Sequence, residues 1–281
     1  MNRHLVQRLG FTLLGLCVLI VVAPILLVIG IIVVRGAGAI SWEFLTAVPR
    51  DGMKAGGIFP PIVGTLLLTL GTALAAMPVG IGGAIYLSEY ARDTLLTRSI
   101  RLAIVNLAGI PSIVYGLFGL ALFVLLLRFG TSILAGSFTL AIMTLPIIIS
   151  TAEEALRAVP MEFRTVNASL GGTRWQGIRQ IVIPQALPGI ITGTILGLLR
   201  AAGETAPILF TVAVFYLPHL PRSPFDPTMA LPYHLFVIST QVPGMPMEIQ
   251  YGTALVLLIL VLSMSIVASI IRSYFRHRRQ W

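Results

Sequence analysis

Two oppositely charged side chains lie inside the long apolar run LLRAAGETAPILF, residues 198–210. Arg200 and Glu204 are four residues apart, so on a helix their side chains share one face and can form an ion pair. Arginine keeps its proton when it is buried, and its planar fork of N–H donors matches a tetrahedral oxyanion. The pair therefore has two possible uses: Arg200 binds a passing anion, or the two charges only neutralise each other in apolar surroundings.

The residues beside this pair favour a use beyond neutralisation. A buried ion pair can often be replaced by apolar residues without loss of stability, so its presence indicates a function. Pro207 has no amide hydrogen, which leaves the carbonyl of Gly203 without its helical partner. We therefore expect Gly203 and Pro207 to form a hinge beside a cavity where water or a ligand satisfies the free groups. Thr205, Ser112 and Tyr115 are further candidates to line this path, although a hydroxyl in a helix often bonds its own backbone.

The composition is that of a polytopic membrane protein. Of the 281 residues, 57% are hydrophobic and only 10% are charged, with a mean hydropathy of +0.95, whereas soluble domains carry about 25% charged residues. The net charge of +9 does not indicate nucleic-acid binding, because the arginines lie between apolar segments rather than along one face. The single cysteine, Cys17, excludes an intrachain disulfide and is expected to pack in the first helix.

Six apolar stretches are long enough to cross a membrane as helices, which requires about 20 residues each. They cover residues 11–34, 62–87, 102–127, 132–151, 190–216 and 253–271. The first exceeds the apolar core of a cleaved signal peptide, about 7–15 residues. With the N-terminus inside, thirteen basic residues fall on cytoplasmic segments and five fall outside, which predicts that both termini are cytoplasmic. Arg200 then lies about ten residues into its span, roughly 15 Å deep.

Two longer connections separate these spans. The cytoplasmic one, 152–188, reads as a series of short helices: Thr151 and Glu154 have the spacing of a capping box, and a second helix is expected to restart at the next proline. Gly171 and Gly172 should end that second helix.

The external connection, 217–250, contains seven prolines. This density opposes a regular helix, so we expect an extended, half-buried hairpin. The sequence shows no internal repeat, and residues 1–281 are predicted to form a single membrane domain.

The chain lacks the residues that hydrolyse ATP or hold a metal. A P-loop needs a lysine after its glycines, and the only lysine, Lys54 in GMKAGG, falls on the external side and is not followed by Ser or Thr. The four histidines are scattered, and there is no HExxH motif or cysteine pair. We therefore predict no catalytic residue, no metal site and no cofactor in this chain.

A short amphipathic helix is expected over TRWQGIRQIVI, residues 173–183, just before Pro184. Trp175, Ile178 and Val182 recur at helical spacing and are predicted to share one face, while the two arginines point elsewhere. One interpretation is an interfacial helix that lies on lipid headgroups. The other is a projection that fits into a groove of a partner protein.

This segment resembles the cytoplasmic loop signature of ABC-importer permeases, which has Glu-Ala-Ala, three residues, Gly, nine residues and Ile-x-Leu-Pro. Gly171 and IVIP over 181–184 match its second half, whereas Thr165, Val166 and Asn167 occupy the Glu-Ala-Ala positions. The resemblance implies that this loop couples the chain to a separate ATPase. The residues it points to are Gly171, Gly172, Thr173, Arg174, Trp175, Ile178, Ile181 and Pro184.

Two further stretches, GIPSIVYGLFGLALFV (109–124) and RAAGETAPILFT (200–211), resemble the PstA family of phosphate-transport permeases. The resemblance covers most of the chain from about residue 60 onward. It implies an all-α integral membrane protein with the type I importer fold, six transmembrane helices and a cytoplasmic coupling helix, in the cytoplasmic membrane of a bacterium. It also implies three partners: a sister permease similar to PstC, an ATPase dimer similar to PstB that holds ATP and Mg²⁺, and an external phosphate-binding protein similar to PstS.

If the cargo is phosphate, its oxygens compete with Glu204 for Arg200, and Glu204 can accept a hydrogen bond from protonated phosphate while it repels sulfate. Three alternatives stay open: a permease for another oxyanion such as molybdate or sulfate, a proton-coupled secondary carrier with Glu204 as proton relay, and a membrane anchor or sensor that moves nothing. The missing inverted repeats count against the carrier.

Overall fold

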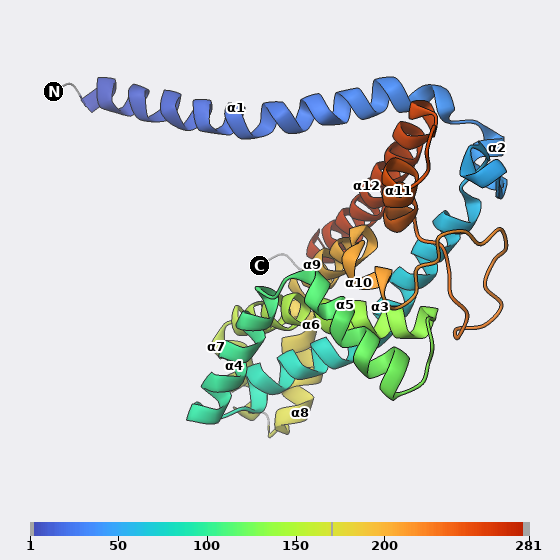
Figure 1. The fold of residues 1–281 in the computed structure, drawn as a ribbon. Helices are drawn as coiled ribbons and strands as arrows, with labels where there is room; N and C mark the ends of the chain where they lie inside the picture. Colours follow the sequence, from blue (N-terminus) through green and yellow to red (C-terminus); the bar gives the residue numbers. More distant parts are fainter. Residues whose placement is uncertain (1–2, 170, 278–281) are drawn as a thin grey trace.

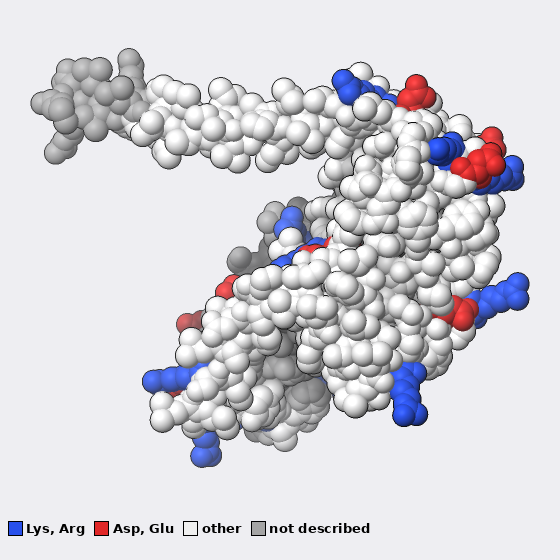
Figure 2. Space-filling view, viewed as in Figure 1, with Lys and Arg blue, Asp and Glu red and all other residues white. Residues whose placement is uncertain are grey.

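The computed structural model describes residues 3–169 and 171–277 as a helical bundle from which one long helix extends (Figure 1). Its centre consists of three helices that pack on one another: α3 (Phe59–Ile85), α6 (Ile133–Arg157) and α9 (Ile183–Gly203). α12 (Met247–His277) packs against α9, and α1 (Arg3–Gly36) contacts α12. Most of the surface visible in Figure 2, including the middle of α1, carries no charged side chain.

This architecture agrees with the predicted membrane fold. Among the described residues, five helices are long and apolar enough to cross a membrane, and one bent pair supplies a sixth if it is counted as a single span. The prediction of an all-helical membrane protein is therefore confirmed. Apolar runs of this length can satisfy their backbone in a bilayer only as helices.

The central helices approach closely because they carry small residues, and hydroxyls that donate to carbonyls of their own helix. The buried hydroxyls of Thr65 and Thr69 on α3 donate to the carbonyls of Pro61 and Thr65, at 2.8 Å each. Gly193 on α9 lies against Thr151 on α6, because a Cβ at Gly193 would stand 1.7 Å from the Thr151 hydroxyl. Only glycine permits this contact between α6 and α9.

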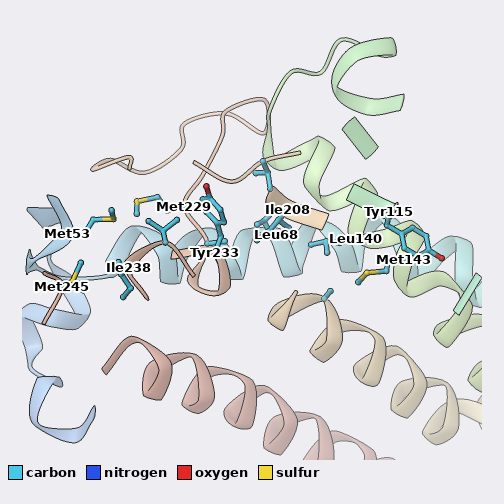
Figure 3. Close-up of a cluster of buried hydrophobic side chains, with 14 residues drawn as sticks. Met53, Leu68, Tyr115, Leu140, Met143, Ile208, Met229, Tyr233, Ile238 and Met245 are labelled. Carbon is cyan, nitrogen blue, oxygen red and sulfur yellow. The ribbon is translucent and has the colours of Figure 1, made fainter. Parts of the chain in front are cut away.

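Short elements cover the end of the bundle at which α1 ends and α12 begins (Figure 1). They are η1 (Ala37–Ala39), α2 (Trp42–Thr46), an antiparallel hairpin of β1 (Pro49–Arg50) and β2 (Ala55–Gly56) around η2 (Asp51–Met53), and α11 (Leu231–Thr240). A buried cluster joins them to the central helices (Figure 3). It includes Met53 from the hairpin, Ile238 from α11, Leu68 from α3 and Leu140 from α6.

The predicted span over 102–127 is not one continuous helix. α4 (Leu95–Ala108) and α5 (Ser112–Gly119) meet at an angle of 103°, and a π-helical segment, η4 (Leu120–Leu126), extends α5. The break falls at Gly109-Ile110-Pro111, where Gly109 caps α4 and Pro111 precedes α5. Proline cannot donate to the preceding turn and opposes a helical residue before it, so the chain changes direction here.

The predicted capping box at Thr151 and Glu154 is also absent, because α6 continues to Arg157. The Thr151 hydroxyl donates to the carbonyl of Ile147 at 2.6 Å instead of accepting from a new helix. A threonine inside an existing helix can satisfy its hydroxyl in this way, and the spacing to Glu154 then has no capping role. The central helix therefore extends past the predicted span end at 151.

The proline-rich connection holds a regular helix that was not expected. α11 (Leu231–Thr240) begins with Pro232 in its first turn, where a missing amide hydrogen costs nothing. The next proline is Pro243, so ten residues are free to form a helix. His234 on α11 is buried, and this burial lowers the pKa of its imidazole to about 4, which keeps the ring neutral at physiological pH.

Candidate translocation site and coupling loop

Arg200 and Glu204 form the predicted ion pair at the end of a helix. Arg200 lies in the last turn of α9, and its Nε donates to Glu204 Oε1 at 3.3 Å. The two side chains are 36% and 19% exposed, so each remains within reach of water or a ligand. A cation in the last turn is stabilised by the helix dipole. This distance is longer than the 2.7–2.9 Å of the other four ion pairs among the described residues.

The predicted hinge is a complete break in the helix. α9 ends at Gly203 instead of continuing to residue 216, and Glu204 has extended backbone angles, φ −78° and ψ 135°. A short helix, α10 (Ala206–Leu209), then starts with Pro207 in its first turn. Thr205 precedes α10 and its side chain is half-buried. Pro207 favours a new helix start over a kink, because its fixed φ suits the first turn. Arg200 therefore lies near a helix end rather than in the middle of a helix.

The second broken helix packs directly on this first break. A Cβ at Gly116 of α5 would stand 2.9 Å from the carbonyl oxygen of Ala206 and 3.1 Å from Cα of Pro207. Tyr115, on the same helix, is buried and its hydroxyl donates to the carbonyl of Leu107 at 2.7 Å. Tyr115 thus lies on the helix that packs on the break beside the ion pair.

Two broken helices pack together at this site, and one of the breaks leaves backbone groups available beside the ion pair. Non-helical backbone within a membrane protein is tolerated where it is covered by protein or lines a wet cavity. The stretch Glu204–Thr205 offers such backbone groups beside a guanidinium and a carboxylate, and the helix that follows the break at Gly109–Pro111 packs on α10. The arrangement can hold a small anion transiently through Arg200 while Glu204 accepts a hydrogen bond.

The coupling loop contains the predicted short helices in a different arrangement. α7 (Met161–Ser169) is followed by Gly171 with a positive φ of 74°, and the amide of Gly172 donates to the carbonyl of Asn167 at 3.0 Å. Thr173 then caps α8 (Arg174–Gly177) in a capping box with Gln176. The two glycines end the second helix as expected.

α8 does not stop before Pro184. It runs through a π-helical turn, η5 (Ile178–Val182), into α9, so that residues 174–203 are continuously helical. Pro184 falls in the first turn of α9, immediately after the wide turn, where its missing amide hydrogen disturbs the helix least. α8 is therefore continuous with the helix that carries Arg200.

The predicted common face of this helix is divided between core and solvent. Ile178 and Val182 are buried, and Val182 packs with Leu156 and Ala186. Trp175 is 51% exposed, and Ile181 is half-buried. The loop thus presents a tryptophan outward from a base of buried aliphatic residues.

One buried acidic residue that contacts this loop was missed by the sequence analysis. Glu89, in the π-helical turn η3 (Tyr86–Tyr90) after α3, is 7% exposed and accepts from Arg164 of α7 at 2.9 Å and 3.3 Å. Arg164 also donates to the carbonyls of Leu156 and Val159 at the end of α6, at 2.9 Å and 2.5 Å. Arg164 therefore joins α7 to η3 and to the end of α6.

Arg174 fastens α8 to the same turn. Its guanidinium donates to the carbonyl of Glu89 and lies 5.1 Å from the ring centre of Tyr90. A π-helical turn leaves carbonyls without their usual partners, and arginines from other elements occupy them. The spacing of these residues in the sequence gave no signal for contacts that join positions so far apart.

Comparison with known proteins places this architecture in one family. Residues 76–281 match the profile of the binding-protein-dependent transport system inner membrane component. The chain belongs to this family. It shares 33% identity with the phosphate transport system permease protein PstA 2 of Mycobacterium bovis, over 100% of this chain and 91% of that protein. It shares 37% identity with PstA of Pasteurella multocida, over 74% of each chain.

Two further likenesses agree with the family. The chain is 33% identical to the probable ABC transporter permease protein YqgI of Bacillus subtilis, over 86% of each. An inward-facing structure of the MetNI methionine ABC transporter is similar in fold, with a TM-score of 0.63 at 17% identity, over 76% of this chain and 94% of that one. The chain is thus a multi-pass membrane permease of the ABC-importer class, and this class works with an ATPase and a binding protein.

Proposed function

We propose that this chain is the transmembrane subunit of an ATP-driven importer of inorganic phosphate, with Arg200 and Glu204 in its translocation path. The observation that carries the proposal is the ion pair at two packed helix breaks. Phosphate permeases resemble the chain over its whole length, which supports phosphate as the anion. Both side chains of the pair are partly exposed, so Arg200 can exchange the carboxylate of Glu204 for an incoming anion.

Phosphate exchange at this site keeps the charges balanced throughout. An incoming phosphate replaces the Glu204 carboxylate on the Arg200 guanidinium, which donates to its oxygens. Near neutral pH phosphate retains at least one proton, so Glu204 can accept a hydrogen bond from it. Sulfate has no proton to donate and is repelled by the same carboxylate. The site therefore selects for protonated oxyanions while binding them weakly enough to release them.

Coupling to ATP uses the loop rather than this site. ATP and Mg²⁺ belong to the partner ATPase, and its closure would move α8, which is continuous with α9. Arg174 and Arg164 carry the movement to η3 and hence to α3 through Glu89. The two central helices would then tilt together and expose the bound anion to the opposite side.

The substrate is tested by uptake in proteoliposomes that contain the complete importer, with labelled phosphate outside and ATP inside. We expect uptake that needs both ATP and the binding protein, and that excess sulfate or molybdate does not reduce. Competition by sulfate or molybdate would assign another oxyanion. Uptake by this chain alone down a pH gradient would instead identify a secondary carrier, and unchanged import after its deletion would identify a mere anchor.

The α1 arm indicates that a second permease subunit completes the bundle. Residues 10–34 of α1 are exposed almost throughout, and none of its most apolar window is buried within this chain. Its C-terminal end contacts α12, where a Cβ at Gly36 would stand 2.5 Å from the carbonyl oxygen of Tyr251. We propose that the arm lies across the sister permease, which buries part of this apolar surface.

Cys17 provides a direct test, because the single cysteine is exposed in the middle of the arm. A photoactivatable maleimide attached to Cys17 in the purified complex should crosslink to the sister permease upon illumination, and peptide mass spectrometry identifies the partner. The Cys17→Ala chain is the matched control and should give no such product. If the sister chain is never captured although the label is present, the proposed arrangement is wrong.

A further inference from the structure

Two cavities on the cytoplasmic side share the side chains of Arg101 on α4 and Arg157 on α6. The larger, about 540 Å³, is polar and is also lined by Ser88, Arg164 and Arg174. The smaller, about 200 Å³, lies between α4 and α6 and is lined mainly by apolar surface. The two arginines therefore lie between the larger polar cavity and the smaller apolar cavity.

The charges around these arginines are unequal. Glu153 Oε1 accepts from Arg101 Nε at 2.9 Å and forms an ion pair with Arg157 Nη2 at the same distance. Glu89 and Asp93 also line the larger cavity, together with four arginines, and Glu154 lines the smaller one. Counted with Glu153, three carboxylates face four arginines around the larger cavity, which leaves one positive charge. Arg101 also donates to the carbonyl of Leu87 at 2.9 Å, whereas Arg157 is 53% exposed. The surplus charge and the unused donors of Arg157 suit an anion in the larger cavity.

The smaller cavity supplies the apolar half of a binding site. Ile104 and Val105 of α4 line it beside Ser150 of α6, and Val105 is 63% exposed. Leu95, Leu96 and Leu102 on the same helix are also exposed, so α4 presents apolar side chains next to the arginines. Free phosphate would gain nothing from this surface, but an acyl chain would cover it.

We propose that Arg101 and Arg157 bind the phosphate headgroup of an anionic phospholipid of the cytoplasmic leaflet. The first part of one acyl chain lies along Ile104 and Val105, between α4 and α6. Basic pockets between helices at the cytoplasmic face are suited to such headgroups. The lipid would wedge the amphipathic α4 against α6 and neutralise the remaining positive charge. This inference is independent of the transported anion, because neither Arg200 nor Glu204 lines either cavity.

Native mass spectrometry of the complete importer tests this site, with phosphatidylglycerol as the probe and phosphatidylcholine as the neutral comparison. Arg157→Gln removes one headgroup contact and leaves Glu153 paired with Arg101, so folding should be retained. We expect about five- to tenfold weaker phosphatidylglycerol retention. Arg92→Gln makes the same charge change at an exposed cytoplasmic arginine outside both cavities and should leave retention unchanged.

A second variant separates a lipid from a free anion. Val105→Asn alters only the apolar cavity and should also weaken phosphatidylglycerol retention, while millimolar inorganic phosphate should not displace the lipid. The proposal would be overturned if Arg157→Gln or Val105→Asn retained as much phosphatidylglycerol as the wild type. Displacement of the lipid by inorganic phosphate would also overturn it. If the wild-type complex retained no phosphatidylglycerol, the proposal would be wrong, and the partner ATPase would be the occupant that covers the site.

Discussion

Arg200→Lys lowers phosphate uptake by the assembled importer roughly 10- to 100-fold, which corresponds to the loss of one charge-assisted hydrogen-bonding arrangement. Lysine keeps the positive charge but has no planar fork, so it cannot donate two parallel bonds to an oxyanion. The ion pair with Glu204 at 3.3 Å survives as a point-charge contact, which separates substrate binding from folding. Labelled-phosphate uptake in proteoliposomes measures the effect, normalised to the amount of complex.

Arg222→Lys is the matched control for this change. Arg222 is exposed on the external connection and lies outside the proposed path, so uptake should remain at the wild-type level. Glu204→Gln should instead admit sulfate as a competitor, because the repelling carboxylate is gone. Wild-type uptake in both Arg200→Lys and Glu204→Gln would reduce the pair to a structural contact and remove the proposed mechanism.

Local sequence information predicts the helices but not their interruptions. The long apolar runs specify α1, α3 and α12, because a spanning helix satisfies its own backbone and depends little on neighbours. The breaks at Pro111 and Pro207 depend on what packs there: each proline begins a new helix against the other broken helix. Pro146, by contrast, lies inside α6 without ending it. A proline alone therefore does not distinguish a break from a tolerated kink.

Side-chain contacts could be predicted where the residues are close in sequence but not where they are distant. Arg200 and Glu204 are four residues apart, and the structure pairs them. Glu89 and Arg164 are separated by α4, α5 and α6, so no periodicity connects them. The prediction that Trp175 and Ile178 share one face was also too simple, because side chains three residues apart on a helix point in directions that differ by about 60°. At the edge of the core this angle is enough to bury one side chain and expose the other.

Trp175→Ala should weaken the binding of the partner ATPase and thereby reduce uptake. Large aromatic side chains that project from a fixed base are frequent hot spots, and truncation there costs about 2 kcal/mol or more, roughly 30-fold in affinity. We expect the ATPase to dissociate during purification and phosphate uptake to fall at least tenfold. Co-purification of the ATPase and uptake in proteoliposomes are the two measurements.

Trp42→Ala is the control, because Trp42 is also exposed, at 80%, but lies on α2 on the predicted external side. It should change neither measurement. The contrast is informative because the base under Trp175 is rigid: α8 is capped by Thr173, held to η3 by Arg174 and continuous with α9. A substitution at an exposed residue on such a base removes little folding energy, so a loss of ATPase binding would reflect the missing contact. If Trp175→Ala retained both ATPase and uptake, α8 would rest on lipid headgroups, and the connection from ATP to Arg200 would have to run through another part of the loop.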